Sequence, residues 1–378
     1  MLKKYSLLRL ILYFLTLGTI GFGGSIALAQ AMQSELVEKR RWLSEEEFLR
    51  GLTLSQLAPG PLAAQLAIYI GFVKGRILGA TAAGIAFVFP SFLMVLIISM
   101  LYMHYGDLPL IQASLYGIGA SVVGIIAASG YTLTQRTMKK KILLWLIYGL
   151  VFTVTVISNS TSIFLFIGAG LLTMFVYTKE KLSKAQLPVI TPFTFHFASF
   201  STTFLSSLPI KLFSYFFIAG SIAFGGGLAI VPFLQHGVVS QYHWLTHKQF
   251  VDAISVAMIT PGPVVITSTF IGYIAGNISG AIIATIAIFL PVYLIVIFLT
   301  PLFNRHAENP RMIAFVEGVI AAAMASIAGS VILLGMQSVK DISTAIIALS
   351  SAIAMKFFKV PGIILVIAGT VIGIILHH

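Results

Sequence analysis

An internal duplication constrains this 378-residue sequence more than any other feature. The motif Phe-Gly-Gly at 22–24 recurs at 224–226, and Pro-Gly-Pro at 59–61 recurs at 261–263, in both cases 202 positions later. The offset then changes to 201 and holds for the matching Gly and Pro residues that follow. Gly and Pro set the shape of the backbone more than they fill a core. The duplication therefore predicts that the two halves follow the same backbone path.

The duplication divides the chain into a first repeat, a linker and a second repeat, which we assign to 1–184, 185–210 and 211–378. The linker contains no Lys, Arg, Asp or Glu and could form an extra membrane crossing, although Pro188 and Pro192 argue against a regular helix there. Segments interrupted by Gly and Pro at matching places in two halves are a sequence indication of a transporter's binding site.

The composition indicates a membrane protein. Hydrophobic residues make up 58% of the chain and charged residues 9%, with a mean hydropathy of +1.01. About a quarter of a soluble domain is charged. A helix rises about 1.5 Å per residue, and the apolar core of a bilayer is about 30 Å thick. The apolar stretches that we expect to form helices, some of them short, are 77–103, 110–134, 142–157, 163–177, 281–302, 312–336, 342–355 and 363–376. We predict an all-α polytopic membrane protein.

The net charge of +12 does not indicate a nucleic-acid partner, because the basic residues form short clusters between apolar segments, as in cytoplasmic loops. The stretch 35–50 has four Lys and Arg residues and its counterpart 237–252 has one, whereas 105–109 has none and its counterpart 304–311 has two. A second half with uniformly less basic loops would not explain this reversal. We therefore predict inverted-topology repeats with a cytoplasmic N-terminus.

This orientation predicts broken or re-entrant helices. If the basic loops at 39–50 and 74–76 lie on one side, the segments 10–32 and 51–73 must enter and return on that side. Each has a break near its middle, at Phe-Gly-Gly or at Pro-Gly-Pro, and irregular backbone at membrane depth is tolerated only inside protein or beside water. Helices that cross fully at 10–32 and 51–73 are the alternative.

Each half presents two helix starts beside these turns. Helix N-termini carry unpaired N–H groups and a partial positive charge, and they bind anions readily. Four of them at a central axis would hold a small oxyanion without a buried Lys or Arg, with Ser268 as a further donor. The candidate substrate-binding residues are Gly23, Gly24, Ser25, Gln56, Pro59, Gly60, Pro61, Gln65, Gly225, Gly226, Gly227, Thr260, Pro261, Gly262, Pro263 and Thr267. The alternative is that these Gly and Pro residues only allow close packing and kinks.

Two acidic residues are candidates for coupling transport to a proton or cation, because charged groups within a membrane are rare and often functional. Glu317 lies inside an apolar run and could instead form a salt bridge to Arg311 or Arg305. Asp252 could instead be an ordinary charge at a helix N-terminus. We interpret His236, His243 and His247 as loop residues, and we expect no metal and no cofactor.

These motifs resemble the chromate ion transporter family over about 5–180 and 210–375. The resemblance rests on Phe-Gly-Gly, on Arg-Arg-Trp-Leu-Ser at 40–44, on Pro-Gly-Pro and on Phe89-Pro90, with a matching set in the second half. It implies the long, two-domain form, a protein of the bacterial plasma (inner) membrane that exports chromate and so confers resistance. It also implies energy from the membrane potential or a proton gradient, and the chain lacks a Walker-type ATP loop. One departure is Arg50, where the family's first domain more usually has an acid.

Other functions remain open from the sequence. Sulfate is a tetrahedral dianion like chromate, so the substrate could be sulfate or another such oxyanion, and a passive anion channel would need the same site. An enzyme is disfavoured because the chain has no cysteine and neither a His-Glu-x-x-His nor a Gly-x-Ser-x-Gly motif. The expected partners are the oxyanion, protons and the lipid bilayer, and the sequence leaves a homodimer open.

Overall fold

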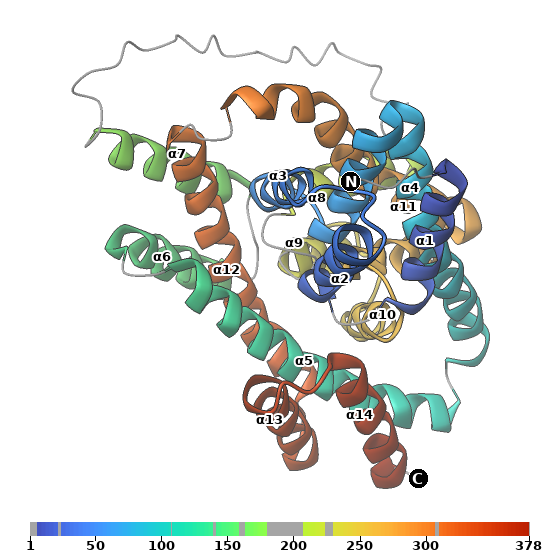
Figure 1. Cartoon of the computed structure of the whole chain (residues 1–378). Coiled ribbons are helices and arrows are strands. Elements are labelled where there is room, and N and C mark those ends of the chain that lie inside the picture. Colours follow the sequence, from blue (N-terminus) through green and yellow to red (C-terminus); the bar gives the residue numbers. More distant parts are fainter. Residues whose placement is uncertain are drawn as a thin grey trace.

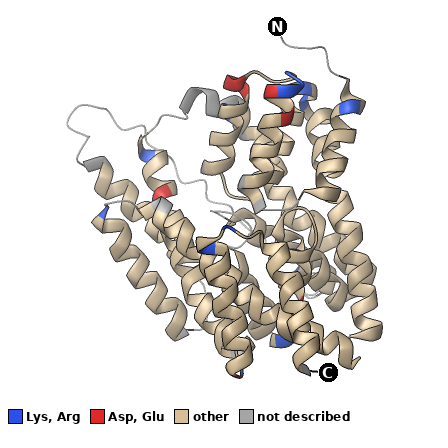
Figure 2. Cartoon of the chain, turned by 60° about the horizontal axis from the view of Figure 1, so that its bottom comes forward, with Lys and Arg blue, Asp and Glu red and all other residues tan. Residues whose placement is uncertain are grey.

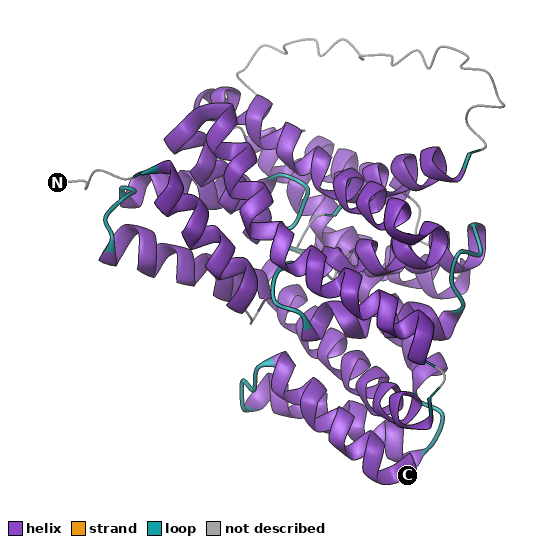
Figure 3. Cartoon of the chain, turned by 90° about the vertical axis from the view of Figure 1, so that its right-hand side faces the viewer, coloured by secondary structure: helices purple, strands orange, loops and turns teal. Residues whose placement is uncertain are grey.

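The computed structural model describes residues 6–21, 24–106, 108–138, 141–158, 163–179, 207–223, 230–306 and 310–377. Helices make up most of these residues, short loops connect them, and no strand occurs among them (Figure 3). This confirms the predicted all-α fold class. The linker assigned to 185–210 lies outside the described residues, except for its last few residues, where a helix begins.

The helices follow one another in the same order in both halves (Figure 1). The first half contains α1 (Leu7–Ile20), α2 (Gly24–Gln33), η1 (Ser34–Lys39), α3 (Glu45–Leu57), α4 (Leu62–Tyr105), α5 (Pro109–Met138), α6 (Ile142–Ser158) and α7 (Ile163–Lys179). The second half contains α8 (Leu208–Ser221), α9 (Val231–Gln235), η3 (His236–Gln241), α10 (His247–Ile259), η4 (Val264–Ile266), α11 (Thr267–His306), α12 (Pro310–Ser338), α13 (Ile342–Phe357) and α14 (Gly362–His377).

The duplication extends to local backbone details. α3 and α10 both begin with a capping box, in which the side chain at the N-cap, Ser44 or Thr246, accepts a hydrogen bond from the third residue of its helix. Ahead of each cap, Arg41 and His243 adopt almost the same positive φ, 53° and 52°. Because few residues adopt this conformation, its recurrence at equivalent positions shows that the two halves share a backbone path.

α4 is folded back on itself near its start. Gly75 and Arg76 have non-helical dihedral angles, and a Cβ atom on Gly71 would overlap the carbonyl oxygen of Gly79. Residues eight apart in a straight helix are about 12 Å apart, so 62–74 and 77–105 run side by side in opposite directions. α11 has the same fold-back at Gly276.

The first part of α4 pairs with α3 in a hairpin whose tip is the Pro-Gly-Pro turn. At the open end of this hairpin, the Lys74 Nζ lies 3.1 Å from the Glu47 Oε2. The segment formed by α2 and η1 also returns toward α1, because the Arg40 guanidinium after η1 lies 5.6 Å from the centre of the Tyr13 ring in α1. This is the path predicted for a re-entrant segment. Figure 2 shows charged residues of both signs gathered at the end near the N-terminus, with the C-terminus at the opposite end.

Equivalent helices of the two halves run antiparallel. In α4 and α11, the Thr81 and Tyr293 hydroxyls are 2.6 Å apart, which pairs an early position of one helix with a late position of the other. In α5 and α12, Gly130 packs on Ile327, and Gly335 packs on Val123. The two repeats are therefore inverted relative to each other.

The halves are also interlaced. α5 packs along α13 and α14, and α12 packs along α6 and α7, so each half supplies the helix on which the other half's last two helices rest (Figure 1). The contacts are close: a Cβ on Gly117 would overlap the backbone of Gly369, and one on Gly124 would overlap that of Ala348. Small residues allow such approach between helices in membranes, where lipid offers no hydrophobic drive for association.

Four described helical segments are long and apolar enough to cross a bilayer: Leu62–Tyr105, Pro109–Gln135, Val264–Phe298 and Pro310–Met336. Large apolar side chains lie on the outside of the molecule, such as Phe164 and Ile342, each 80% exposed. A surface of this kind suits lipid rather than water. The chain is therefore a multi-pass membrane protein.

Candidate functional site

The two Pro-Gly-Pro turns meet the opposite half of the molecule. The backbone N–H of Gly60 donates to the carbonyl oxygen of Ala223 at 3.0 Å, and that of Gly262 donates to the carbonyl oxygen of Gly21 at 3.1 Å. Gly60 and Gly262 are equivalent positions, and so are Gly21 and Ala223. The pair of bonds is therefore related by pseudo-twofold symmetry. It joins each Pro-Gly-Pro turn to the residue just before the other half's Phe-Gly-Gly motif, and we call this arrangement the central crossing.

Both turns require glycine. Gly60 has φ +132° and Gly262 has φ +105°, a region that residues with a Cβ rarely adopt. A Cβ on Gly60 would lie 2.6 Å from Val292 Cγ2, and one on Gly262 would overlap Ser91 Oγ. Each turn is therefore packed against the long helix of the other half as well as hydrogen-bonded across the molecule.

Ser91 also belongs to the crossing, although it was not among the predicted site residues. It is fully buried, and its hydroxyl donates to the Pro261 carbonyl oxygen at 2.7 Å. The sequence carried one signal, since Ser91 follows Pro90 and its equivalent position holds the apolar Val292. A lone serine in an apolar helix is nonetheless common, because its hydroxyl can bond its own helix.

Three of the predicted polar ligands have their donors occupied. Gln65 is fully buried, and its Nε2 donates to the carbonyl oxygens of Pro59 at 2.6 Å and Ala58 at 3.3 Å. The hydroxyl of Thr260 donates within α10, and that of Thr267 donates to Val264 at 2.7 Å. Since a hydroxyl has one proton, neither threonine can also donate to an anion in this conformation. Gln65 instead supports the turn from within.

The other predicted positions differ in their surroundings. Gln56 is exposed, Ser25 is partly buried in the first turn of α2, and Gly24 begins that helix. Pro59, Pro61 and Pro263 flank the two glycines of the crossing. Gly23, Gly225, Gly226 and Gly227 lie outside the described residues.

Two buried polar atoms beside the turns have no hydrogen-bond partner among the described residues. They are the Oγ of Ser268, near the start of α11, and the Oε1 of Gln65, near the start of α4. Buried polar atoms in folded proteins are nearly always bonded, so these two atoms mark the places beside the turns where a polar partner is missing. α4 begins at Leu62, directly after its Pro-Gly-Pro turn, and the first N–H groups of a helix have no intrahelical acceptor. η4 and α11 follow the other turn.

Asp252 is deeply buried, with 2% of its surface exposed. The hydroxyl of Tyr102, at the far end of α4, donates to its Oδ2 at 2.7 Å. Because α10 begins at His247, Asp252 lies in the second turn and is not a charge at the helix start, which was the alternative. Its equivalent Arg50 lies at the surface, 2.5 Å from Glu46. The two halves therefore differ in charge and burial at this position.

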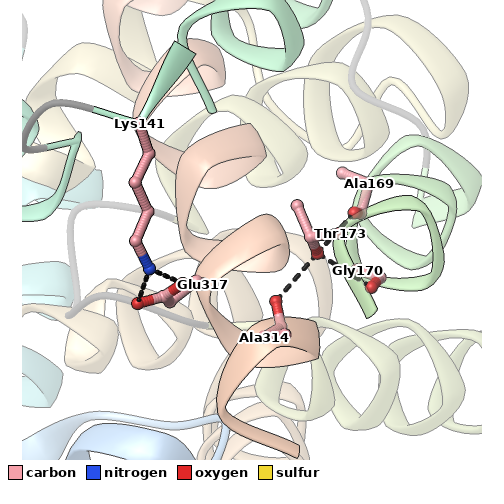
Figure 4. Close-up of polar contacts among 6 residues, drawn as sticks. All are labelled: Lys141, Ala169, Gly170, Thr173, Ala314 and Glu317. Atoms are coloured by element: carbon pink, nitrogen blue, oxygen red, sulfur yellow. Dashed lines mark hydrogen bonds and ion pairs between the residues drawn. The ribbon is translucent and has the colours of Figure 1, made fainter. Parts of the chain in front are cut away.

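Glu317 forms a salt bridge between the halves. Its carboxylate oxygens lie 2.5 and 2.7 Å from the Nζ of Lys141, a residue of the other half that was not among the predicted partners (Figure 4). Both side chains are about one-third exposed, at 31% for Glu317 and 40% for Lys141. One turn earlier on α12, the Ala314 carbonyl accepts a bond from Thr173 of α7 at 2.8 Å. These contacts dock α6 and α7 onto α12.

Within the described residues, no group of three or more His, Asp or Glu side chains is placed to hold a metal ion. His243 and His247 are exposed and His236 is partly buried. Among the described residues, the polar groups of the interior are backbone amides, hydroxyls, glutamine side chains and the carboxyl group of Asp252.

Comparison with known proteins agrees with the duplicated architecture. The family model described as chromate transporter matches the chain twice, over residues 8–174 and 210–374. The chain belongs to the chromate transporter family. It is 47% identical to a chromate transport protein of Cupriavidus metallidurans, over 99% of this chain and 95% of the relative. It is 44% identical to a probable chromate transport protein of Synechococcus elongatus, over 98% and 96%.

An uncharacterized transporter of Methanocaldococcus jannaschii is 32% identical over 80% of this chain and 78% of its own length. No solved structure matches the chain. Membership of the chromate transporter family agrees with the resemblance seen in the motifs, and the relatives are named as transport proteins and not as enzymes.

Proposed function

We propose that this member of the chromate transporter family carries chromate across the plasma membrane as a secondary active exporter and so confers chromate resistance. The observation that carries the proposal is the central crossing, where Gly60 and Gly262 join the two inverted halves by equivalent hydrogen bonds. A symmetric, irregular backbone at the middle of an inverted-repeat membrane protein is the usual place of a transporter's substrate site.

The site suits a small oxyanion. The first N–H groups of α4 and of the η4–α11 segment, together with the unpaired hydroxyl of Ser268, supply donors without a fixed positive charge. A tetrahedral dianion such as chromate presents acceptors on all sides. We propose that the residues of the two Phe-Gly-Gly and Pro-Gly-Pro motifs hold it, with Gln65, Thr260 and Thr267 shaping the turns.

We propose that transport alternates between the two inverted halves, since the site lies on the axis that relates them. The crowded basic end near the N-terminus would face the cytoplasm, where its positive charge would attract anions. This orientation places the C-terminus on the far side. It also places the first turns of α10, which include Asp252, toward the outside of the cell.

Coupling to protons would use Asp252. Burial disfavours the charged form of a carboxyl group, so a buried acid can take up and release a proton during a transport cycle. Asp252 fits this role better than Glu317, because Glu317 is partly exposed and already paired with Lys141.

A sulfate transporter is the second candidate, because a site made of backbone N–H groups distinguishes chromate from sulfate poorly. The test is chromate accumulation by everted membrane vesicles, with and without an imposed proton gradient and with excess sulfate. Gradient-driven accumulation supports an exporter. Movement of sulfate without chromate would replace the substrate, and flux of either anion that ignores the gradient would indicate a channel.

The site assignment is tested separately with Gly60→Leu and Gly262→Leu, which place a large side chain in the crossing. We expect both to abolish flux while the protein still reaches the membrane. The matched control is Gly149→Leu in α6, where an added Cβ would have no neighbour within 4 Å. Normal flux in both crossing variants would contradict the assignment.

A further inference from the structure

A polar cavity opens at the end of the molecule opposite the basic loops. Its volume is about 790 Å³, and it lies between the starts of α5 and α10 and the end of α12, so both halves contribute to it. Gln112 and Tyr116 line it from α5, Lys248 and Asp252 from α10, and Lys340 from the residues after α12. None of the residues of the two Pro-Gly-Pro turns lines it.

Two lysines lie at the mouth of this cavity. Lys248 and Lys340 are both exposed, and Lys248 contacts the side-chain oxygen of Gln112. Of the acidic residues nearby, Asp252 is buried in the wall and bonded by Tyr102, and Asp341 accepts a hydrogen bond from Tyr116 at 2.5 Å. Both acids are thus held by tyrosine hydroxyls, whereas the lysine ammonium groups have donors to offer a ligand.

The size of the cavity also suits an anion. Its lining includes Ser338, whose Oγ has almost no accessible surface and no hydrogen-bond partner among the described residues. The cavity therefore combines two ammonium groups with enough space for a hydrated oxyanion. α10 connects it to the central crossing, since the helix starts beside Lys248 and ends just before the Pro-Gly-Pro turn at 261–263. This path is about 16 Å long at about 1.5 Å per residue.

We propose that this cavity is a second anion site, a vestibule in which Lys248 and Lys340 bind a tetrahedral dianion before or after it occupies the central crossing. The inference rests on the proposed oxyanion transport. In this proposal, the two lysines bind the anion as it enters or leaves at the end of the molecule that lacks the basic loops. Lined by cations and protein dipoles, the vestibule would raise the local concentration of dianions at one mouth of the path.

The chain contains no cysteine, so one reactive thiol can be placed in the vestibule without a background. His247→Cys is suitable because His247 is exposed and lines the cavity. The probe is an anionic methanethiosulfonate reagent applied to purified protein in lipid nanodiscs. We expect sulfate to slow modification at least about fivefold relative to chloride at equal ionic strength. A dianion that occupies the vestibule both blocks the thiol and repels the reagent.

The decisive comparison adds Lys248→Gln and Lys340→Gln to the His247→Cys protein. We expect this double change to remove most of the sulfate protection, whereas Lys248→Arg with Lys340→Arg should keep it. Lys359→Gln, which removes one exposed lysine outside the cavity lining, should leave protection unchanged. Two results would overturn the proposal. One is sulfate protection that is equal with and without the two lysines, and the other is sulfate protection no greater than that by chloride.

The result separates this inference from the proposed function. Sulfate protection does not need turnover, so it should persist when Gly60→Leu is added to the His247→Cys protein. Chromate flux in vesicles without any protection at position 247 would refute the vestibule and leave the transport proposal standing. Protection that depends on the lysines, in a protein that moves no chromate, would support the vestibule and contradict chromate export.

Discussion

Replacing Gly262 by alanine tests whether the central crossing holds the two halves together. The backbone at Gly262 has φ +105°, and a residue with a Cβ held in such a region costs about 1–3 kcal/mol. The new Cβ would also overlap Ser91 Oγ and lie 3.1 Å from Ser91 Cβ. Ser91 must therefore rotate and give up its bond to Pro261, which contributes about 0.5–1.5 kcal/mol. We expect Gly262→Ala to lower the free energy of unfolding by about 2–4 kcal/mol.

The assay is reversible unfolding in mixed detergent micelles, with chromate flux measured on the same variants. Gly149→Ala is the control, and it should stabilise α6 by up to about 1 kcal/mol because alanine favours a helix more than glycine does. Ser91→Ala should cost about 1 kcal/mol alone. In the double variant Gly262→Ala with Ser91→Ala, the same hydrogen bond is lost only once. The combined cost should therefore fall short of the sum by about 1 kcal/mol.

Two results would refute this reasoning. One is a Gly262→Ala protein as stable as the Gly149→Ala control. The other is strict additivity of the two changes to within about 0.3 kcal/mol, the agreement expected of independent sites. Either would mean that the turn is not held against Ser91 as the structure shows.

Three further predictions concern other contacts. Asp252→Asn should remove the dependence of chromate flux on the proton gradient, measured in vesicles. Arg50→Gln, at the equivalent exposed position, should leave that dependence intact. Unchanged gradient dependence in Asp252→Asn would exclude Asp252 as the coupling residue. Glu317→Gln should lower the free energy of unfolding by only about 0.5–1 kcal/mol, because its salt bridge with Lys141 is partly exposed. In the same unfolding assay, the charge swap Glu317→Lys with Lys141→Glu should keep most of the stability of the original pair. A flux defect that the swap does not rescue would instead favour a coupling role for Glu317. Thr246→Ala and Ser44→Ala should each lower the free energy of unfolding by about 1 kcal/mol, because each removes an N-cap hydrogen bond. An effect in one half only would show that α3 and α10 do not contribute equally to stability.

Much of the fold could be predicted from sequence because it depends on local properties. Apolar stretches and the repeated Gly and Pro residues locate the helices and their breaks, and the all-α class is confirmed. The short stretches 142–157 and 163–177 became α6 and α7 with bounds shifted by at most two residues. The fold-back at Gly75 could be anticipated only indirectly, from the basic residues Lys74 and Arg76.

The candidate site was only partly accessible in this way. The sequence indicated that the Pro-Gly-Pro turns matter, but Thr260, Thr267 and Gln65 were expected to face a ligand and instead bond the backbone near them. A hydroxyl or amide can donate to its own helix or to a distant group with similar energy, and the sequence does not say which partner lies within reach. The pairing of Glu317 with Lys141 was not predicted for the same reason, because Lys141 comes close only once α6 packs on α12.

What the sequence by itself determined is therefore the duplicated, all-helical membrane architecture and the positions of its breaks, because hydrophobicity and the backbone preferences of Gly and Pro act within a few residues. What only the tertiary structure decided is how the halves interlock: Gly60 with Ala223, Gly262 with Gly21, and α5 with α13 and α14. These contacts join residues far apart along the chain, and their geometry depends on the whole packing arrangement. No local pattern of residues encodes which carbonyl oxygen a distant glycine N–H will meet.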